Sequence, residues 1–414
     1  MKLNLFAMPT IPSTLDERLQ ERPIGRSSRR YQMMLDELRQ LAVLADGLGY
    51  DSFSTTEHHF HTEGGEMMPN PLLLFADLAA RTERLQFIPF SIVLPADNPI
   101  RVAEDIALLT QLSQGRVGVA FARGYQKRWI QVISQGGSVS NADAQGDAVN
   151  REVFEENLDV VRKAWAEDAF SLDGKHFQVP YPYEEGVTGW PAVEWTRTYG
   201  ADGEIDEDGV IRRIGVVPSP YEGMAPPIFV PLTLSPATVD FAARNGLTGF
   251  IFSPQPQFRE VCERYRSASA EHGQDLALGQ RLGANRGISV AASYDEAFEI
   301  GARSAGHSFQ YYFGKFGFNE VFRTADDDPV EPVTFEDEYD CAQRLIDIGW
   351  LLCGTPDELK GQVEELRTMG GGGELEWLQW SFYQQGAVPL EVQLRQVEIF
   401  AKEVRPEFAE AGGR

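Results

Sequence analysis

The protein has 414 residues, 43% hydrophobic and 24% charged, which is the composition of a globular chain long enough for one large barrel or two domains. Its 37 Lys and Arg against 62 Asp and Glu give a net charge of −25, which argues against a nucleic acid or an anionic membrane as partner and favours a small-molecule substrate. Because its three cysteines lack disulfide or metal-site spacing and no apolar run reaches about 18 residues, we expect a cytoplasmic protein in a reducing compartment.

The first part of the chain alternates between predicted strands and helices. Asn70-Pro71 is typical of a helix start, with an N-cap residue and a proline at the first helical position. After these elements comes an irregular, acidic stretch with a predicted helix at 151–167 and a hairpin at Asp173-Gly174, and we interpret 125–227 as an insertion because the alternation then resumes. The predicted elements before it are strands at 3–8, 51–56, 85–94 and 116–122, and helices at 31–49, 71–82 and 99–112.

The second part continues the alternation to the C-terminus. Thr355 and Glu358 form a predicted capping box at the start of a late helix. A second irregular stretch, rich in aromatic residues and glycine, predicts another insertion near 306–345. The predicted elements are strands at 228–232, 249–252, 287–292 and 375–381, and helices at 236–246, 259–272, from 293, 355–369 and 390–404. Eight strands alternating with helices predict an α/β fold, a single (β/α)8 TIM barrel with two large insertions, as one domain over 1–414.

Three of the six histidines follow the second predicted strand, in the stretch YDSFSTTEHHFH at Tyr50 to His61. Reactive side chains at the carboxyl end of a strand are typical of the active sites of β/α barrels. A single histidine is more often a hydrogen-bonded structural group than a catalyst, but a cluster with Glu57, His58, His59 and His61 favours a functional site.

Two further strand ends carry groups suited to a phosphate. Arg123-Gly124-Tyr125 combines a planar guanidinium with a glycine that lets the backbone approach a ligand. Ser235-Pro236-Ala237-Thr238 predicts a helix start with free N–H groups, a positive dipole end and two hydroxyls. Each motif has an ordinary alternative: Arg123 as a surface arginine, and Ser235 as a simple N-cap. Together they indicate a phosphorylated cofactor.

A rival hypothesis is a metal-dependent hydrolase. His59 and His61 lie on one face of an extended segment and are suited to binding a metal, but zinc needs at least one more ligand. The remaining histidines, His176, His272 and His307, lie in segments poorly placed to supply it.

These residues resemble the bacterial luciferase-like, flavin-dependent monooxygenases over nearly the whole chain. The resemblance is carried by motifs in order along the sequence: Glu57-His58-His59-Phe60, Val93-Leu94-Pro95, Arg101 to Asp105, Gln111-Leu112-Ser113 with Gly115-Arg116, Ala122 to Tyr125, Ser235 to Thr238, and Gly354 to Glu358. Two positions depart from the family pattern: Phe90 replaces a residue that is frequently small, and Asn98 a residue that is frequently histidine.

The resemblance implies reduced FMN, supplied by a separate NAD(P)H-dependent flavin reductase, which reacts with O2 to oxygenate a small organic substrate. It implies His58 in catalysis with His59 in support, and no metal. The implied cofactor ligands are Arg123, Ser235 and Thr238 at the phosphate, Tyr125 in the same turn as Arg123, Glu57 beside the flavin ring, and Phe90 and Ser91 through an unusual backbone.

Several alternatives remain at this stage. A deazaflavin-dependent oxidoreductase uses the same fold, and a flavin-binding protein without catalysis is a third possibility beside the metal hydrolase. The substrate, and the choice between hydroxylation, Baeyer–Villiger insertion and aldehyde oxidation, are open. We expect a homo-oligomer, with a dimer favoured, and aromatic residues of the insertions, Trp190, Trp195, Tyr311, Tyr312 and Phe313, either line a substrate pocket or serve in packing.

Overall fold

A closed parallel barrel of eight strands forms the centre of the fold. The computed structural model describes residues 1–124, 126–135, 144–233, 235–372 and 374–408. The barrel strands are β1 (Lys2–Ala7), β2 (Ser52–Thr56), β3 (Gln86–Val93), β4 (Val119–Ala122), β7 (Ile228–Leu232), β8 (Thr248–Ile251), β9 (Leu282–Val290) and β11 (Trp377–Phe382). They neighbour one another in chain order, and the pairs β8–β9, β9–β11 and β11–β1 close the ring, which confirms the predicted fold class.

One strand was missed by the sequence analysis and another was placed too late. β10 (Leu351–Gly354) pairs in parallel with the second half of β9, where Leu351 lies opposite Gly287. Its four residues run directly into the capping box of the next helix, so no separate element is apparent in the sequence. The prediction of 287–292 for β9 was wrong at its start, because the strand includes the polar residues Asn285 and Arg286, both fully buried.

Aromatic side chains fill the interior of the barrel. Phe90 lies 5.0 Å from Phe6 and 5.7 Å from Phe250 between ring centroids, and Phe250 contacts Trp377 edge-on. All residues of β2 are buried, as expected for a strand covered on both faces. The strands therefore form where short apolar runs can be buried, and they bring their carboxyl ends to one mouth of the barrel.

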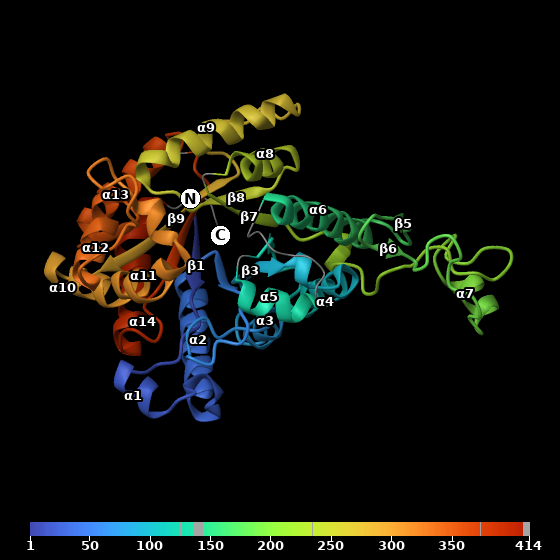
Figure 1. Ribbon diagram of the computed structural model, residues 1–414, viewed down its shortest axis with the longest axis horizontal. Helices are drawn as coiled ribbons and strands as arrows, with labels where there is room; N and C mark the ends of the chain where they lie inside the picture. Colours follow the sequence, from blue (N-terminus) through green and yellow to red (C-terminus); the bar gives the residue numbers. More distant parts are fainter. Residues whose placement is uncertain (125, 136–143, 234, 373, 409–414) are drawn as a thin grey trace. The chain divides into compact units, whose positions relative to one another are not determined.

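The chain divides into two compact units, one of residues 1–71, 81–90 and 228–414, the other of 72–80 and 91–227. In the first, helices α10 to α14 surround β9 and its neighbours (Figure 1). The helices of this unit are α1 (Leu15–Gln20), α2 (Ser28–Leu48), α8 (Pro236–Arg244), α9 (Gln255–Glu271), α10 (Tyr294–Gly301), α11 (His307–Tyr311), α12 (Glu338–Asp347), α13 (Pro356–Met369) and α14 (Leu390–Ile399). The capping box of Thr355 and Glu358 is confirmed at the start of α13.

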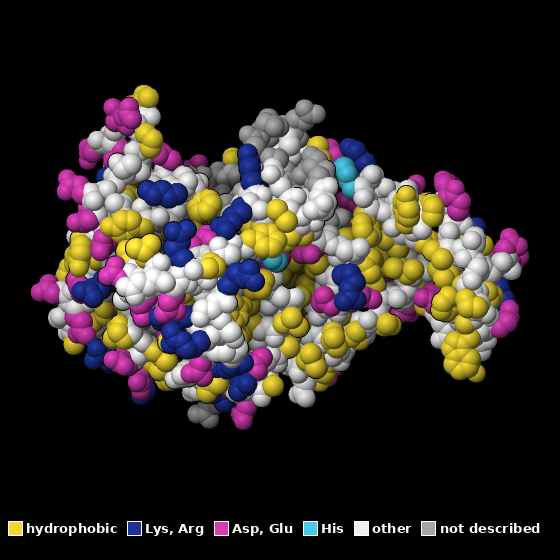
Figure 2. Space-filling view, turned by 60° about the horizontal axis from the view of Figure 1, so that its bottom comes forward, with side chains coloured by type: hydrophobic (Ala, Val, Ile, Leu, Met, Phe, Trp, Pro, Cys, Tyr) yellow, Lys and Arg dark blue, Asp and Glu magenta, His cyan; other side chains and the backbone are white. Residues whose placement is uncertain are grey.

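The second unit contains the segment 125–227 that the sequence predicts as the first insertion. Its helices are α3 (Pro71–Ala79), α4 (Pro99–Leu112), α5 (Lys127–Ser134), α6 (Ala144–Ala166) and α7 (Val193–Tyr199), with a hairpin of β5 (Leu172–Asp173) and β6 (Gln178–Val179). The predicted hairpin is confirmed, and the predicted helix at 151–167 is α6, which begins earlier. Within this unit α7 lies far from α4 and α5, beyond the hairpin (Figure 1). The insertion exposes aromatic side chains such as Trp195 and Tyr199, and Figure 2 shows hydrophobic and acidic side chains mixed on this part of the surface, at the right.

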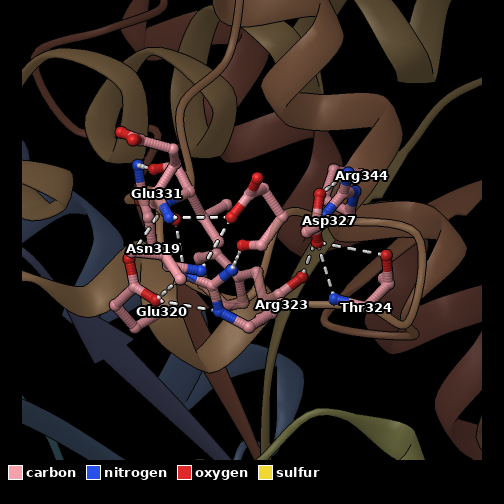
Figure 3. A network of polar contacts seen from close by, with 11 residues as sticks. Asn319, Glu320, Arg323, Thr324, Asp327, Glu331 and Arg344 are labelled. Atoms are coloured by element: carbon pink, nitrogen blue, oxygen red, sulfur yellow. Dashed lines mark hydrogen bonds and ion pairs between the residues drawn. The ribbon is translucent and has the colours of Figure 1, made fainter.

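The second insertion is built from short helical turns and closed by charged contacts. After α11 come one-turn helices at Phe313–Phe316 and Phe318–Phe322, then a loop that leads to α12. Arg344 of α12 donates to both carboxylate oxygens of Asp327, at 2.8 and 3.0 Å, and Asp327 also accepts from the backbone and hydroxyl of Thr324 (Figure 3). These contacts pin the loop to α12.

The helices and the cysteines can be compared with what the sequence predicts. Within the described ranges, no helix combines the length and the apolar character needed to cross a membrane. The three cysteines, Cys262, Cys341 and Cys353, are free thiols buried in the first unit.

Candidate functional site

The end of β2 delivers Glu57 and His58 into buried positions. The His58 backbone N–H donates to the carbonyl of Met68 at 2.9 Å, so the loop after β2 folds back over the strand end. The Tyr31 hydroxyl donates to the carbonyl of Met67 and holds this return. A strand end covered in this way fixes side chains at the barrel mouth, as an active site requires.

The imidazole of His58 is held between a hydroxyl and a carboxylate. Its Nδ1 lies 2.9 Å from Oγ1 of Thr56, and its Nε2 lies 3.3 Å from Oε1 of Glu66. Burial, with a smaller contribution from His61, lowers the pKa of His58 to about 3, and the carboxylate of Glu57 opposes this shift. His58 is therefore neutral at neutral pH and can take up a proton at a ring nitrogen.

The other two histidines of the cluster have different partners. Nε2 of His59 lies 2.8 Å from Oε1 of Glu57, so these two predicted site residues form a pair. The ring of His61 stacks on that of His58 with centroids 5.7 Å apart, and its Nδ1 lies 2.9 Å from the carbonyl of Gly65. The structure thus brings the whole predicted cluster together.

Phe90 and Ser91 combine a core side chain with an unusual backbone. The ring of Phe90 is fully buried among barrel aromatics, so a cofactor contact here would come from its backbone. Ser91 has a φ of 73°, in the left-handed region that non-glycine residues seldom adopt. Among the described residues, cis peptide bonds precede prolines only. The unusual feature of the backbone at Phe90 and Ser91 is therefore the positive φ of Ser91 and not a cis peptide bond.

Arg123 lies in the second unit, where it is already paired. Its Nη1 donates to Oδ1 of Asp147 at 2.7 Å. Gly124 has a φ of +77°, and a Cβ there would lie 2.4 Å from Cδ1 of Ile130, so its backbone conformation and its packing both favour glycine. Tyr125, the other predicted ligand in this turn, lies outside the described residues.

Ser235 and Thr238 form a pair of hydroxyls at the N-terminus of α8. Ser235 occupies the N-cap position, yet its side chain makes no capping hydrogen bond. Instead the Thr238 hydroxyl donates to Oγ of Ser235 at 3.2 Å. Pro236 has no N–H, and the helix start presents its positive dipole end beside the two hydroxyls, which is a donor set that fits a phosphate.

A cavity of about 490 Å³ lies in the first unit beside the histidine cluster. Residues from the N-terminal and the C-terminal parts of the chain line it. The second insertion contributes aromatic side chains to the lining. Met8, which follows β1, and Tyr383, which follows β11, line the cavity as well. The volume is that of a site for a small organic molecule. Of the five aromatic residues singled out in the sequence, Tyr311, Tyr312 and Phe313 line this cavity, whereas Trp190 and Trp195 are surface residues of the other unit.

Sequence reasoning missed Glu66 as a site residue. Its carboxylate lines the 490 Å³ cavity and also a second one of about 200 Å³ that contains His58 and His61. A signal was present, since Glu66 is an acidic residue in the loop directly after the histidine cluster. Its backbone, with a φ of 47°, could not be foreseen.

The metal hypothesis rests on His59 and His61. Within the described part of the chain, no three His, Cys, Asp or Glu side chains group as a metal site would require. Nε2 of His59 and Nδ1 of His61, in the pair considered for a metal, contact Glu57 and Gly65 respectively.

Comparisons with known proteins identify relatives along the chain. Residues 11–372 match the family model described as luciferase-like monooxygenase. The chain is 26% identical over 398 residues to 3,6-diketocamphane 1,6-monooxygenase of Pseudomonas putida, covering 93% of this chain and 96% of that one. It is 25% identical over 247 residues to the alkanal monooxygenase alpha chain of the Kryptophanaron alfredi symbiont, covering 59% of this chain and 56% of that one.

Solved structures share the fold. The oxygenating constituent of 3,6-diketocamphane monooxygenase from Pseudomonas putida, a type II Baeyer–Villiger monooxygenase in complex with FMN, is 24% identical with a TM-score of 0.72, covering 99% of each chain. An F420-dependent secondary alcohol dehydrogenase is 15% identical with a TM-score of 0.61, also covering 99% of each chain. The likeness of these structures supports the fold, and the family model spans most of the sequence. The protein therefore belongs to the luciferase-like monooxygenase family.

Proposed function

We propose that the protein is a two-component, FMN-dependent monooxygenase that takes reduced FMN from a separate NAD(P)H-dependent flavin reductase and uses O2 to oxygenate a small organic substrate. The observation that carries the proposal is the N-terminus of α8, where the hydroxyls of Ser235 and Thr238 face each other and neither caps the helix. Support comes from the diketocamphane monooxygenase relative and from the FMN bound to its oxygenating constituent.

In this proposal the bound flavin supplies the oxygen chemistry, and the chain positions the reactants. Ser235 and Thr238 hold the phosphate. Arg123 remains a predicted phosphate ligand, and its guanidinium would then contact the phosphate in place of the carboxylate of Asp147. Tyr125, Glu57, Phe90 and Ser91 remain predicted cofactor contacts.

The proton chemistry falls to the histidines of the β2 end. His58 is neutral and buried, so it can accept a proton from the reacting centre, and His59, paired with Glu57, is its proposed support. The burial of His58 and Glu57 also keeps bulk water from these groups.

We propose the 490 Å³ cavity as the substrate site. Four of the charged side chains that line it are engaged within the protein: Arg18 donates to the carbonyls of Glu63 and Ile11, Glu66 accepts from Tyr312, Glu338 accepts from Tyr311, and Arg303 pairs with Glu299. A charged substrate would find these groups already committed, so we expect a neutral molecule with a ring or chain of carbon atoms that packs against the aromatic side chains.

The phosphate site can be tested with matched variants. Because Ser235 makes no cap, Ser235→Ala with Thr238→Val should lower FMN affinity about 10- to 100-fold while leaving thermal stability unchanged. Ser293→Ala is the control, since Oγ of Ser293 does cap α10 by accepting from Glu296, and its loss should cost about 1 kcal/mol with FMN affinity intact. Fluorescence titration and thermal melts measure both. Wild-type protein that binds neither reduced nor oxidised FMN would contradict the proposal.

The nearest alternative is a deazaflavin-dependent oxidoreductase, because F420-dependent enzymes share the fold. Turnover with a reduced or oxidised deazaflavin in the absence of O2 would favour it over a monooxygenase. We further propose a homodimer in the cytoplasm, which sedimentation of the purified protein and fractionation of its source cells would check.

A further inference from the structure

Glu66 is a buried carboxylate with contacts to two sides. Its side chain is 6% exposed, and its Oε1 lies 3.3 Å from Nε2 of His58. Its Oε2 accepts a hydrogen bond of 2.9 Å from the hydroxyl of Tyr312, a residue of the second insertion 246 positions away in the sequence. A carboxylate taken out of water needs such donors, and Nδ1 of His61 also lies 3.9 Å from the same Oε2.

The hydrogen-bond partners around Glu66 determine which ring nitrogens of His58 and His61 carry protons. The carbonyl of Gly65 can only accept, so Nδ1 of His61 carries a proton and donates to it. The Tyr312 hydroxyl, 3.2 Å from that Nδ1, then directs its own proton to Glu66. With Oε1 of Glu66 as the acceptor, Nε2 of His58 carries a proton, which leaves Nδ1 of His58 to accept from the hydroxyl of Thr56.

The backbone at Glu66 is also unusual. Its φ of 47° lies in the left-handed region, which costs free energy for a residue with a side chain and persists where the surroundings enforce it. Met67, the next residue, donates its N–H to the carbonyl of Pro9 at 2.6 Å, which anchors the loop on the far side of Glu66. The loop is thus held in a conformation that points the carboxylate at His58.

From this geometry we propose that Glu66 is a positioning residue that fixes the orientation and tautomer of His58, and that Tyr312 holds Glu66 in place from the wall of the substrate cavity. Its role in turnover rests on the proposed function. The orientation of a base by a third group is what makes an imidazole effective in proton transfer. Since Tyr312 lines the 490 Å³ cavity, a substrate there would lie against the residue that supports the base.

The direct test is nitrogen NMR of the histidine rings in the full-length protein, with the His58 signals assigned by their loss in His58→Asn. In the wild type we expect a protonated Nε2 and an unprotonated Nδ1 at neutral pH. Glu66→Gln should give a mixture of tautomers, and Tyr312→Phe a smaller change in the same direction. This readout requires no enzymatic turnover.

Tyr311→Phe is the matched control. Tyr311 neighbours Tyr312, lines the same cavity and also donates to a carboxylate, that of Glu338 at 2.9 Å, but it has no contact with Glu66 among the described hydrogen bonds. It should leave the His58 signals unchanged. Unchanged His58 signals in Glu66→Gln, or equal effects of Tyr311→Phe and Tyr312→Phe, would overturn the inference.

Kinetics separate the inference from the proposed function. With reduced FMN, O2 and a turned-over substrate, Glu66→Gln should lower kcat about 10- to 100-fold and change its pH profile, with a smaller effect for Tyr312→Phe. If the NMR changes appear but the wild type forms no oxygenated product, the proposed function fails and the positioning role stands. If the product forms and the His58 signals do not respond, the positioning role fails alone.

Discussion

At the scale of single residues, the histidine cluster shows how the environment divides similar side chains into different roles. His58 and His61 are buried and stack on each other, and both lie near Glu66, yet His58 also contacts the hydroxyl of Thr56 while His61 donates to a backbone carbonyl. His59 is more exposed and pairs with Glu57. The chemistry available to each ring therefore depends on its neighbours more than on its place in the motif.

The neutral burial of His58 predicts a pH-dependent stability. Folding lowers the pKa of His58 from its ordinary value to about 3. Below about pH 6.5 the unfolded chain therefore binds a proton at His58 that the folded protein does not bind until the pH approaches 3. The free energy of unfolding should fall as the pH drops from 6.5 toward 3. A His58→Gln variant should show a flatter dependence of Tm on pH in this window.

The control for this measurement is His272→Gln, which changes an exposed histidine that follows α9. It should keep the wild-type slope. A His58→Gln slope equal to that of the wild type would show that another group governs the acid sensitivity.

At the scale of elements, the predicted second insertion has a loop that is closed by ion pairs. Asp327 receives hydrogen bonds from Arg344 and Thr324, and Arg323 donates to Glu320 and to backbone carbonyls of the same loop (Figure 3). This loop follows the turns that carry Tyr312 and Phe313. These contacts offset part of the chain entropy that is lost when the loop is ordered, and so they help to keep the cavity wall in place.

Loss of the Asp327 carboxylate should loosen this loop. The hydrogen bonds from Arg344 lower the pKa of Asp327 below its ordinary value, so the pair adds stability above about pH 4 that is lost as the pH falls further. Asp327→Asn should cost about 1 kcal/mol at pH 7, since the pair is partly exposed, and should speed amide hydrogen exchange across 313–335.

Asp326→Asn is the matched control, because Asp326 is the exposed neighbour of Asp327. It should leave exchange in this loop unchanged. An Asp327→Asn effect that persists at full size below pH 3 would rule out the ion pair as its cause.

At the scale of the whole molecule, the net charge of −25 has the same sign as the phosphate of FMN. We therefore expect the association rate of FMN to rise about twofold to fivefold as salt increases from about 10 to 200 mM, because screening weakens the repulsion. Stopped-flow fluorescence measures this rate. A rate that falls with salt would mean that the local field of the phosphate site outweighs the global charge.

The sequence predicted those parts of the molecule that depend on local patterns. The eight barrel strands, the Thr355 cap and the grouping of Glu57 with the histidines follow from apolar runs, capping chemistry and the common mouth of parallel strands. β10 and the true start of β9 did not, because a four-residue strand and buried polar residues break those patterns. The contact of Tyr312 with Glu66 joins segments 246 positions apart, which no local pattern encodes.

The three free thiols give this protein a chemical property suited to an oxygen-using family. Burial raises the pKa of Cys262, Cys341 and Cys353 to about 12 in each case, so almost none of the nucleophilic thiolate is present at neutral pH. Oxidation of cysteine proceeds through the thiolate and requires access to it. Oxidants near the barrel would therefore find no ready sulfur target among these three residues, and disulfide cross-linking through them is disfavoured.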